Sequence, residues 1–197
     1  MTQNGKNTRD EVRNLVRNAS DDLRSDGVQP RNYVEQLTWL FFLKAFDQQE
    51  DRREEEAAFN DEPYKRRLTG EFAWSAWSKL TNDPKEMLTF VNDKLWKKLT
   101  SQDPNVGLGE DGLAQRFRRI FETVKNYSRT ASIFSSVVQQ VDKLDFSSQE
   151  DVDVLGLVYE DLLKDVAGDS AGFAGEFYTP RHLVNLMVKV ADPQPGD

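Results

Sequence analysis

Apolar side chains recur every three or four positions along most of the chain, and this spacing constrains the fold more than any other feature. Such a stripe lies on one face of an α-helix, whereas a half-buried strand needs strict alternation of apolar and polar residues. No segment alternates in that way with any strength. The helical pattern covers residues 12–23, 30–44, 84–99, 113–124, 132–144, 155–166 and 183–190. We therefore predict a mainly α protein with at least five helices and no sheet of more than two strands.

The second helical segment contains the most continuously apolar stretch of the chain, Trp39–Leu43. A helix that is apolar on every side is buried, so we expect this stretch at the centre of a helical bundle. Gly27 should end the first helix and Pro30 should open the second, because glycine stops helices and proline suits their first turn. The charged tail Gln48–Glu56 is expected to project into solvent. The aromatic region 59–77 has no period and should form short turns or helices.

Composition narrows the class of protein further. The chain has no cysteine, which excludes disulfides and thiolate metal sites and fits a reducing cytoplasm. The polar start, Met1–Asp10, lacks the apolar run of a signal peptide, and no apolar stretch is long enough to span a bilayer. These features predict a soluble, cytoplasmic protein without a membrane partner. The formal net charge of −8 makes the chain a poor DNA binder by itself, since lysine and arginine supply most non-specific affinity for phosphates.

Three short motifs suggest chemistry but favour plain structural explanations. Residues 107–112 read G-x-G-x-x-G, yet a phosphate-binding loop needs a preceding strand, and residues 101–105 do not form one. Residues 61–64, Asp-Glu-Pro-Tyr, match only faintly the Asp/Asn-Pro-Pro-Tyr loop of adenine methyltransferases and are interpreted as a solvated turn. His182 is the only histidine and has no partner at ligand spacing, so a metal site there is not favoured.

Four short basic clusters are candidates for contacts with DNA. They are Arg52–Arg53, Lys65–Arg67, Lys94–Lys98 and Arg116–Arg119. In an acidic chain each is more often a solvated helix face than a phosphate contact. The second and fourth clusters remain candidates for contacts with the DNA backbone.

The character of the chain changes after residue 166. A stretch rich in glycine, alanine and serine follows, and we place a domain boundary there, with domains at 1–170 and 171–197. Thr179 can cap the helix that Pro180 opens, since proline suits the first helical position. Free N–H groups and the positive dipole end at such a helix start suit a carboxylate ligand. Phe177 and Tyr178 offer flat surfaces for an adenine ring or a methionine chain; taken alone, however, the segment is an ordinary capped helix after a linker.

Three segments together resemble the modification subunits of type I restriction-modification systems. The first, Tyr33–Lys44, is similar to that family's N-terminal signature, in which a Tyr helix leads into a Leu-Phe-Leu-Lys segment. The second is the helix Asp153–Leu163, and the third is Gly175–Val184, which contains Glu-Phe-Tyr-Thr-Pro-Arg. Their order and spacing match the approach to the family's methyltransferase domain. Most of the chain takes part in the resemblance, although residues 50–102 contribute little to it.

The resemblance implies a fold, a cofactor and a site. The fold is an N-terminal helical bundle domain followed by the truncated start of an α/β S-adenosylmethionine-dependent methyltransferase domain. The residues expected to bind S-adenosylmethionine are Glu176, Phe177, Tyr178, Thr179, Pro180 and Arg181. The family's Asp-Pro-Ala-Cys-Gly-type and Asn-Pro-Pro-Phe loops are absent from this sequence, so no catalytic residue and no metal ligand is expected, and the chain alone should be inactive.

The resemblance also implies a function and partners. A full-length parent would methylate the N6 amine of adenine in DNA. Its partners would be DNA, a specificity subunit and a second modification subunit, with the restriction subunit as a further candidate. The helical domain would assist subunit assembly and help to enclose DNA. The alternative is a non-enzymatic helical interaction module, which explains the acidic charge equally well but not the ordered Gly-Glu-Phe-Tyr-Thr-Pro ending.

Overall fold

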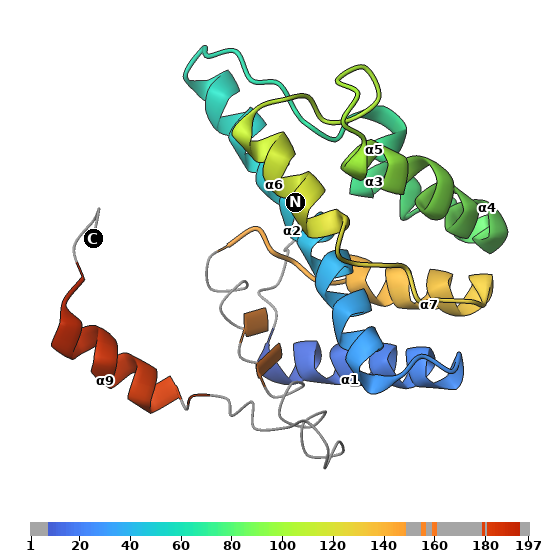
Figure 1. Ribbon diagram of the computed structural model, residues 1–197, viewed down its shortest axis with the longest axis horizontal. Helices are drawn as coiled ribbons and strands as arrows, with labels where there is room; N and C mark the ends of the chain where they lie inside the picture. Colours follow the sequence, from blue (N-terminus) through green and yellow to red (C-terminus); the bar gives the residue numbers. More distant parts are fainter. Residues whose placement is uncertain (1–7, 149–154, 157–158, 161–178, 180, 194–197) are drawn as a thin grey trace.

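The computed structural model describes residues 8–148, 155, 156, 159, 160, 179 and 181–193 (Figure 1). Its α-helices, in chain order, are α1 (Arg9–Ser25), α2 (Pro30–Phe59), α3 (Trp74–Trp77), α4 (Pro84–Thr89), α5 (Trp96–Thr100), α6 (Gly112–Phe121), α7 (Ala131–Asp142) and α9 (Arg181–Ala191). The 3-10 turns η1 (Gly70–Phe72) and η2 (Leu80–Asn82) flank α3, and a π turn, η3 (Phe90–Leu95), joins α4 to α5. No strand occurs in these residues, which confirms the mainly α prediction. Within them, no helix combines the length and apolar character needed to cross a membrane.

The first two helices begin and end where the sequence supplies the local signals. At the start of α1 the Glu11 N–H donates to the Thr8 hydroxyl (3.3 Å), and the Glu11 carboxylate accepts from the Thr8 N–H (2.9 Å). This capping box satisfies two N–H groups that the helix leaves free. Gly27 follows α1 with a φ of +78°, which glycine adopts at low cost because it lacks a Cβ. Pro30 occupies the first turn of α2, so both predicted boundaries are confirmed.

Helix α2 provides the centre of the bundle and lies against both α1 and α7 (Figure 1). Within Trp39–Leu43 every side chain except Phe42 is buried, with at most 4% of its surface exposed. Phe42 is half-buried and its ring lies 5.3 Å from that of Phe117 and 6.0 Å from that of Phe121, both on α6. The predicted burial of this stretch is therefore confirmed, and α2 holds α1, α6 and α7 in one apolar core.

The tail of α2 differs from its predicted exposure at one turn. Residues 51–56 are exposed, as expected, but Asp47 and Glu50 retain only 3% and 1% of their surface. The sequence showed charge without showing its partners, which come from residues 64–75 that fold back over α2. The prediction that Gln48–Glu56 is solvated throughout is therefore wrong for Glu50, and also for Gln48, which is half-buried and accepts a hydrogen bond from the Phe146 N–H (2.7 Å).

Residues 84–100 form one continuous helical rod, as the apolar spacing predicts. Met87, Val91, Leu95 and Leu99 are each no more than 1% exposed. The rod begins at Asp83, whose carboxylate accepts from the N–H groups of Lys85 (3.1 Å) and Glu86 (3.0 Å). Its middle is the π turn η3 rather than α-helix, which the sequence pattern did not predict. The start of the rod packs on α7 and its end on α6.

The predictions for the last helices are confirmed with one exception. Helices α6 and α7 lie where the pattern places them, but Ile120 on α6 is 41% exposed rather than buried with Phe117 and Phe121. Beyond α7, Tyr159 packs partly buried against the core, and its hydroxyl shares a hydrogen bond of 2.7 Å with Thr38 on α2. The rest of the predicted 155–166 helix lies outside the described residues, apart from residues 155, 156, 159 and 160.

Candidate functional site

The predicted cofactor segment is only partly described by the structure. Thr179 is exposed and lies two residues before Arg181, where the described part of α9 begins, and its role as the cap of this helix stays a prediction. Glu176, Phe177, Tyr178 and Pro180 lie outside the described residues, as does the side chain of Arg181. Helix α9 has 11 residues and no acidic side chain in its first turn, so nothing there opposes an anionic ligand. The described residues are thus compatible with a carboxylate site at this helix start.

Helix α9 presents much of its apolar surface to solvent. Leu183, Leu186, Met187, Val188 and Val190 are between 43% and 77% exposed. This helix has the amphipathic spacing of a segment that packs on a partner.

The glycine motif at 107–112 is a loop, as the sequence analysis favours. No strand precedes it, and Lys98 Nζ donates to the Gly107 carbonyl (2.8 Å) while Arg118 donates to the Gly109 carbonyl (2.9 Å). Two of the cations near the loop therefore hold its own backbone. Gly109 has a φ of +104°, a conformation that side chains rarely adopt.

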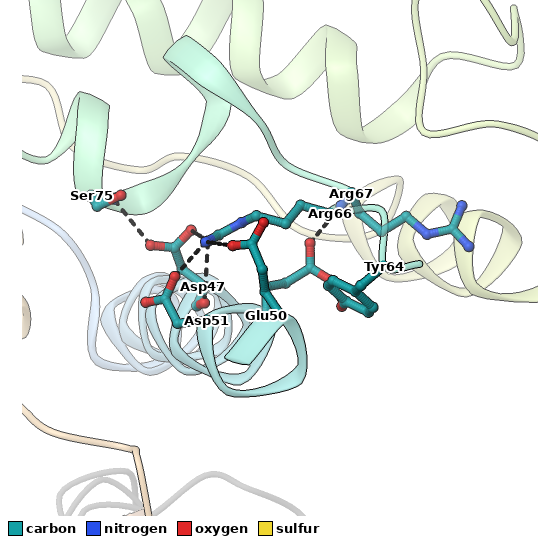
Figure 2. A network of polar contacts seen from close by, with 8 residues as sticks. Asp47, Glu50, Asp51, Tyr64, Arg66, Arg67 and Ser75 are labelled. Atoms are coloured by element: carbon teal, nitrogen blue, oxygen red, sulfur yellow. Dashed lines mark hydrogen bonds and ion pairs between the residues drawn. The ribbon is translucent and has the colours of Figure 1, made fainter. Parts of the chain in front are cut away.

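The Asp-Glu-Pro-Tyr segment at 61–64 is a turn, as predicted, and it leads into a polar network on α2 (Figure 2). Tyr64 donates its hydroxyl hydrogen to the buried carboxylate of Glu50, which also accepts from the N–H of Arg67. These bonds satisfy a charge that would otherwise be costly to bury. The network therefore attaches the connector between α2 and η1 to the side of α2.

Arg66 is the centre of the same network (Figure 2). Its guanidinium pairs with Asp47 (3.0 Å), Asp51 and Glu54 (3.3 Å), three carboxylates that follow one another along a single face of α2. Asp47 also accepts from the N–H of Ser75 (3.2 Å) at the start of α3. Burial raises the pKa of Asp47, and the Ser75 N–H and the Arg66 charge offset this only in part.

Sequence reasoning missed this network, although a signal was present. Positions 47, 50, 51 and 54 have the spacing of one helix face and are all acidic. An acidic stripe on a helix, followed by Lys-Arg-Arg at 65–67, indicates that ion pairs hold the segment after the helix against the helix. The network has the character of a structural clamp rather than of a reaction centre. No cluster of histidine and acidic side chains suited to a metal is found among the described residues.

The four basic clusters differ in whether their lysine and arginine side chains already have partners within the protein. Arg66 and Arg67 of the second cluster are engaged, since Arg67 pairs with Asp111. In the third cluster Lys94 pairs with Glu71 (3.0 Å), and in the first Arg52 donates to the Ser147 carbonyl (2.9 Å). The second cluster is therefore a weak candidate for DNA contacts.

The fourth cluster is different because its outer arginines are unengaged. Arg116 and Arg119 are exposed and form no ion pair within the described part of the chain, whereas Arg118 points back to the glycine loop. Ile120 lies beside them on the same helix face. This face of α6 is the accessible basic surface that the sequence analysis left open.

Comparison with known proteins places these features in a family. The family model of the HsdM N-terminal domain matches residues 12–141 of the sequence, and the family model of the N-6 DNA methylases matches residues 150–197. The methylase subunit of the Escherichia coli type I restriction enzyme EcoEI is 31% identical over 94% of this chain. That of EcoKI from Escherichia coli strain K12 is 28% identical over 90%. The chain spans 37% and 29% of these two relatives, respectively.

Two solved structures have the same fold. One, described as a modification subunit of a type I restriction enzyme from Vibrio vulnificus YJ016, gives a TM-score of 0.82 at 26% identity and covers all of this chain and 43% of its own. The other, from work on complex assembly and conformational transition of the type I R-M system, gives 0.76 at 32% identity over 96% of this chain and 37% of its own. With a family model matching most of its length, the chain belongs to the HsdM N-terminal domain family, the N-terminal region of type I restriction-modification methylase subunits.

Proposed function

We propose that this chain is the N-terminal part of a subunit that transfers a methyl group to the N6 amine of adenine in DNA. The observation that carries the proposal is the order of the two matches, an HsdM N-terminal domain followed directly by the start of an N-6 DNA methylase. S-adenosylmethionine would supply the reactive methyl group, while the protein orients donor and acceptor. The adenine would leave the duplex to reach the donor.

In this proposal, residues Glu176–Arg181 hold the methionine end of the cofactor. The support is physical: Thr179 precedes an 11-residue helix whose first turn lacks acidic side chains. Such a helix start offers free N–H groups and a partial positive charge to a carboxylate. Phe177 and Tyr178 would flank the cofactor's apolar surface.

The helical domain itself would serve assembly and the enclosure of DNA. Its candidate partners are DNA, a specificity subunit and a second modification subunit, and the restriction subunit is a further one. The acidic net charge of −8 supports this division of labour, because phosphate contacts must then come mainly from other parts of the complex.

The direct test is a methyl-transfer assay on the full-length parent with its specificity subunit. We expect label from S-adenosylmethionine in N6-methyladenine, and turnover that continues longer on a closed circular DNA than on a linear one after competitor DNA is added. The 197-residue chain alone should give background incorporation, because the sequence contains no acceptor loop. Label in another base would contradict the N6 assignment, and equal behaviour of circles and linear DNA would contradict enclosure.

The cofactor segment has a separate test in Thr179→Ala of the full-length parent. We expect weaker binding of S-adenosylmethionine, by up to about thirtyfold, because removing a helix cap costs about 0.5–2 kcal/mol and loosens the turn that receives the carboxylate. Calorimetry measures the affinity, and Thr179→Ser, which keeps the hydroxyl, is the matched control. Unchanged affinity in a folded Thr179→Ala protein would leave Thr179 as a helix cap only.

A further inference from the structure

A groove of about 630 Å³ opens between α3 and the start of the rod formed by α4 and η3. Trp77, Leu80 and Phe90 give it an apolar floor, since all three line it and Trp77 and Phe90 are buried in the domain core. None of these residues belongs to the polar network or to the cofactor segment. The groove is therefore a separate feature of the helical domain, with room for a large aliphatic side chain.

The rim of this groove carries excess negative charge. Its acidic lining residues Glu71, Asp83, Glu86 and Asp93 outnumber its two lysines, Lys85 and Lys94. Glu86, Asp93 and Lys85 are exposed and form no ion pair within the ranges that the structure describes. Lys94 is already engaged, because its ammonium pairs with Glu71 (3.0 Å) and lies 5.7 Å from the centre of the Phe90 ring. That contact shows that a cation fits between an acidic rim residue and the aromatic floor. The groove thus suits a partner that joins an apolar side chain to unpaired cations.

The outer face of α6 in the same domain has that chemistry. On α6, Arg116, Arg119 and Ile120 stand at i, i+3 and i+4 and share one outer face. Both arginines are exposed and without ion pairs in the described residues, and Ile120 is 41% exposed. Helix α6 is fixed on the core by Phe117 and Phe121, each 1% exposed, so it cannot leave its place to fill the groove of its own chain. Contact between the two surfaces requires two copies.

We infer that the outer face of α6 in one copy of this chain docks in the α3–α4 groove of a second copy. Ile120 would lie on the apolar floor, and Arg116 and Arg119 would pair with Glu86 and Asp93 at the rim. Arginine is favoured at protein interfaces because its planar group forms forked bonds with carboxylates. The inference rests on the proposed assembly role and names the surface that performs it. DNA as the partner of α6 would leave the acidic groove unexplained.

A charge-reversal experiment on the 197-residue chain tests this pairing. Glu86→Arg/Asp93→Arg places like charges opposite α6, and Arg116→Glu/Arg119→Glu places like charges opposite the groove. Each double variant alone should self-associate at least about tenfold more weakly than the unaltered chain in sedimentation velocity, because facing like charges repel. An equimolar mixture of the two should recover a dimer, since both contacts between the unlike variants again join opposite charges.

The controls separate this result from misfolding and from a role in DNA binding. Arg17→Glu/Arg129→Glu changes charge equally at two exposed positions away from both surfaces and should leave association unchanged. Glu86→Gln/Asp93→Asn removes charge without reversing it and should weaken association less. An unaltered chain that stays monomeric at all concentrations, or a mixture that shows no recovery, overturns the inference. An Arg116→Glu/Arg119→Glu chain that dimerises normally but binds duplex DNA less well also overturns it. None of these outcomes decides whether the parent transfers methyl groups, which the assay on the full-length parent tests separately.

Discussion

Trp39→Ala should lower the free energy of unfolding by about 3–5 kcal/mol, the range for emptying a buried aromatic site. The Trp39 side chain is 1% exposed, and its ring lies 5.2 Å from that of Trp96, edge-on, and 6.3 Å from that of Phe134. It therefore joins α2 to the rod and to α7, and its loss removes contacts with both. The midpoint and slope of a urea titration followed by circular dichroism measure the change.

Two matched substitutions show whether the effect comes from the ring or from its position. The Trp39 Nε1–H is buried and has no hydrogen-bond acceptor within the described residues. Trp39→Phe keeps an aromatic ring and removes that unsatisfied donor, so it should cost much less than the alanine variant. Phe59→Ala removes a ring that is 88% exposed and should change stability little. A Trp39→Ala chain as stable as Phe59→Ala would mean that the centre of the bundle lies elsewhere.

Arg66→Ala should destabilise the domain by about 3 kcal/mol at neutral pH, because it leaves a buried carboxylate without its cation. Asp47 is that carboxylate, with 4% of its side chain exposed. Burial already raises the pKa of Asp47, so ionising this carboxyl costs the folded state free energy. The stability that the protein has with a neutral Asp47 is therefore lost as the pH rises through the pKa of Asp47 in the folded state. Without Arg66 that pKa should rise further. The penalty should therefore be full at pH 7 and shrink as pH falls toward about 4, near the pKa of an unfolded aspartate.

The double variant Arg66→Ala/Asp47→Asn isolates the pair. If the buried charge causes the loss, replacing Asp47 by its neutral analogue should restore part of the stability at pH 7 and remove the pH dependence of the penalty. Lys65→Ala, at an exposed neighbour without an ion pair in the described residues, is the control and should have little effect. A penalty for Arg66→Ala that is the same at pH 4.5 and pH 7 would show that Arg66 acts through packing of its stem rather than through charge.

The sequence predicts the helices well because each is specified locally. The stripe of apolar residues in α1, the capping residues around it and Pro30 all act within a few positions of one another. The polar network could not be predicted to the same degree, because Glu50 is satisfied by Tyr64 and by the backbone of residue 67, well beyond one helical turn. The exposure of Ile120 has the same origin, since only the placement of α6 on the bundle decides which of its apolar residues stays outside.

For the candidate site, the sequence located a segment rather than an arrangement. A helix, α9, follows this segment at Arg181, while the cap at Thr179 stays a prediction. A binding site needs a second wall, however, and the pattern of one helix start says nothing about what faces it. The groove beside α3 was not predicted at all, since Trp77, Glu86 and Phe90 are brought together by the fold and share no motif.

The π turn η3 explains how the rod formed by residues 84–100 can pack on both α7 and α6. Met87, Val91, Leu95 and Leu99 follow one another at steps of four residues. In a regular helix of 3.6 residues per turn, each such step overshoots by about 40°, so three steps would rotate the last side chain about 120° away from the first. A wider turn in the middle takes up part of that rotation. The two ends of the rod consequently stay in phase, and Met87 and Leu99 enter the same core although one end packs on α7 and the other on α6.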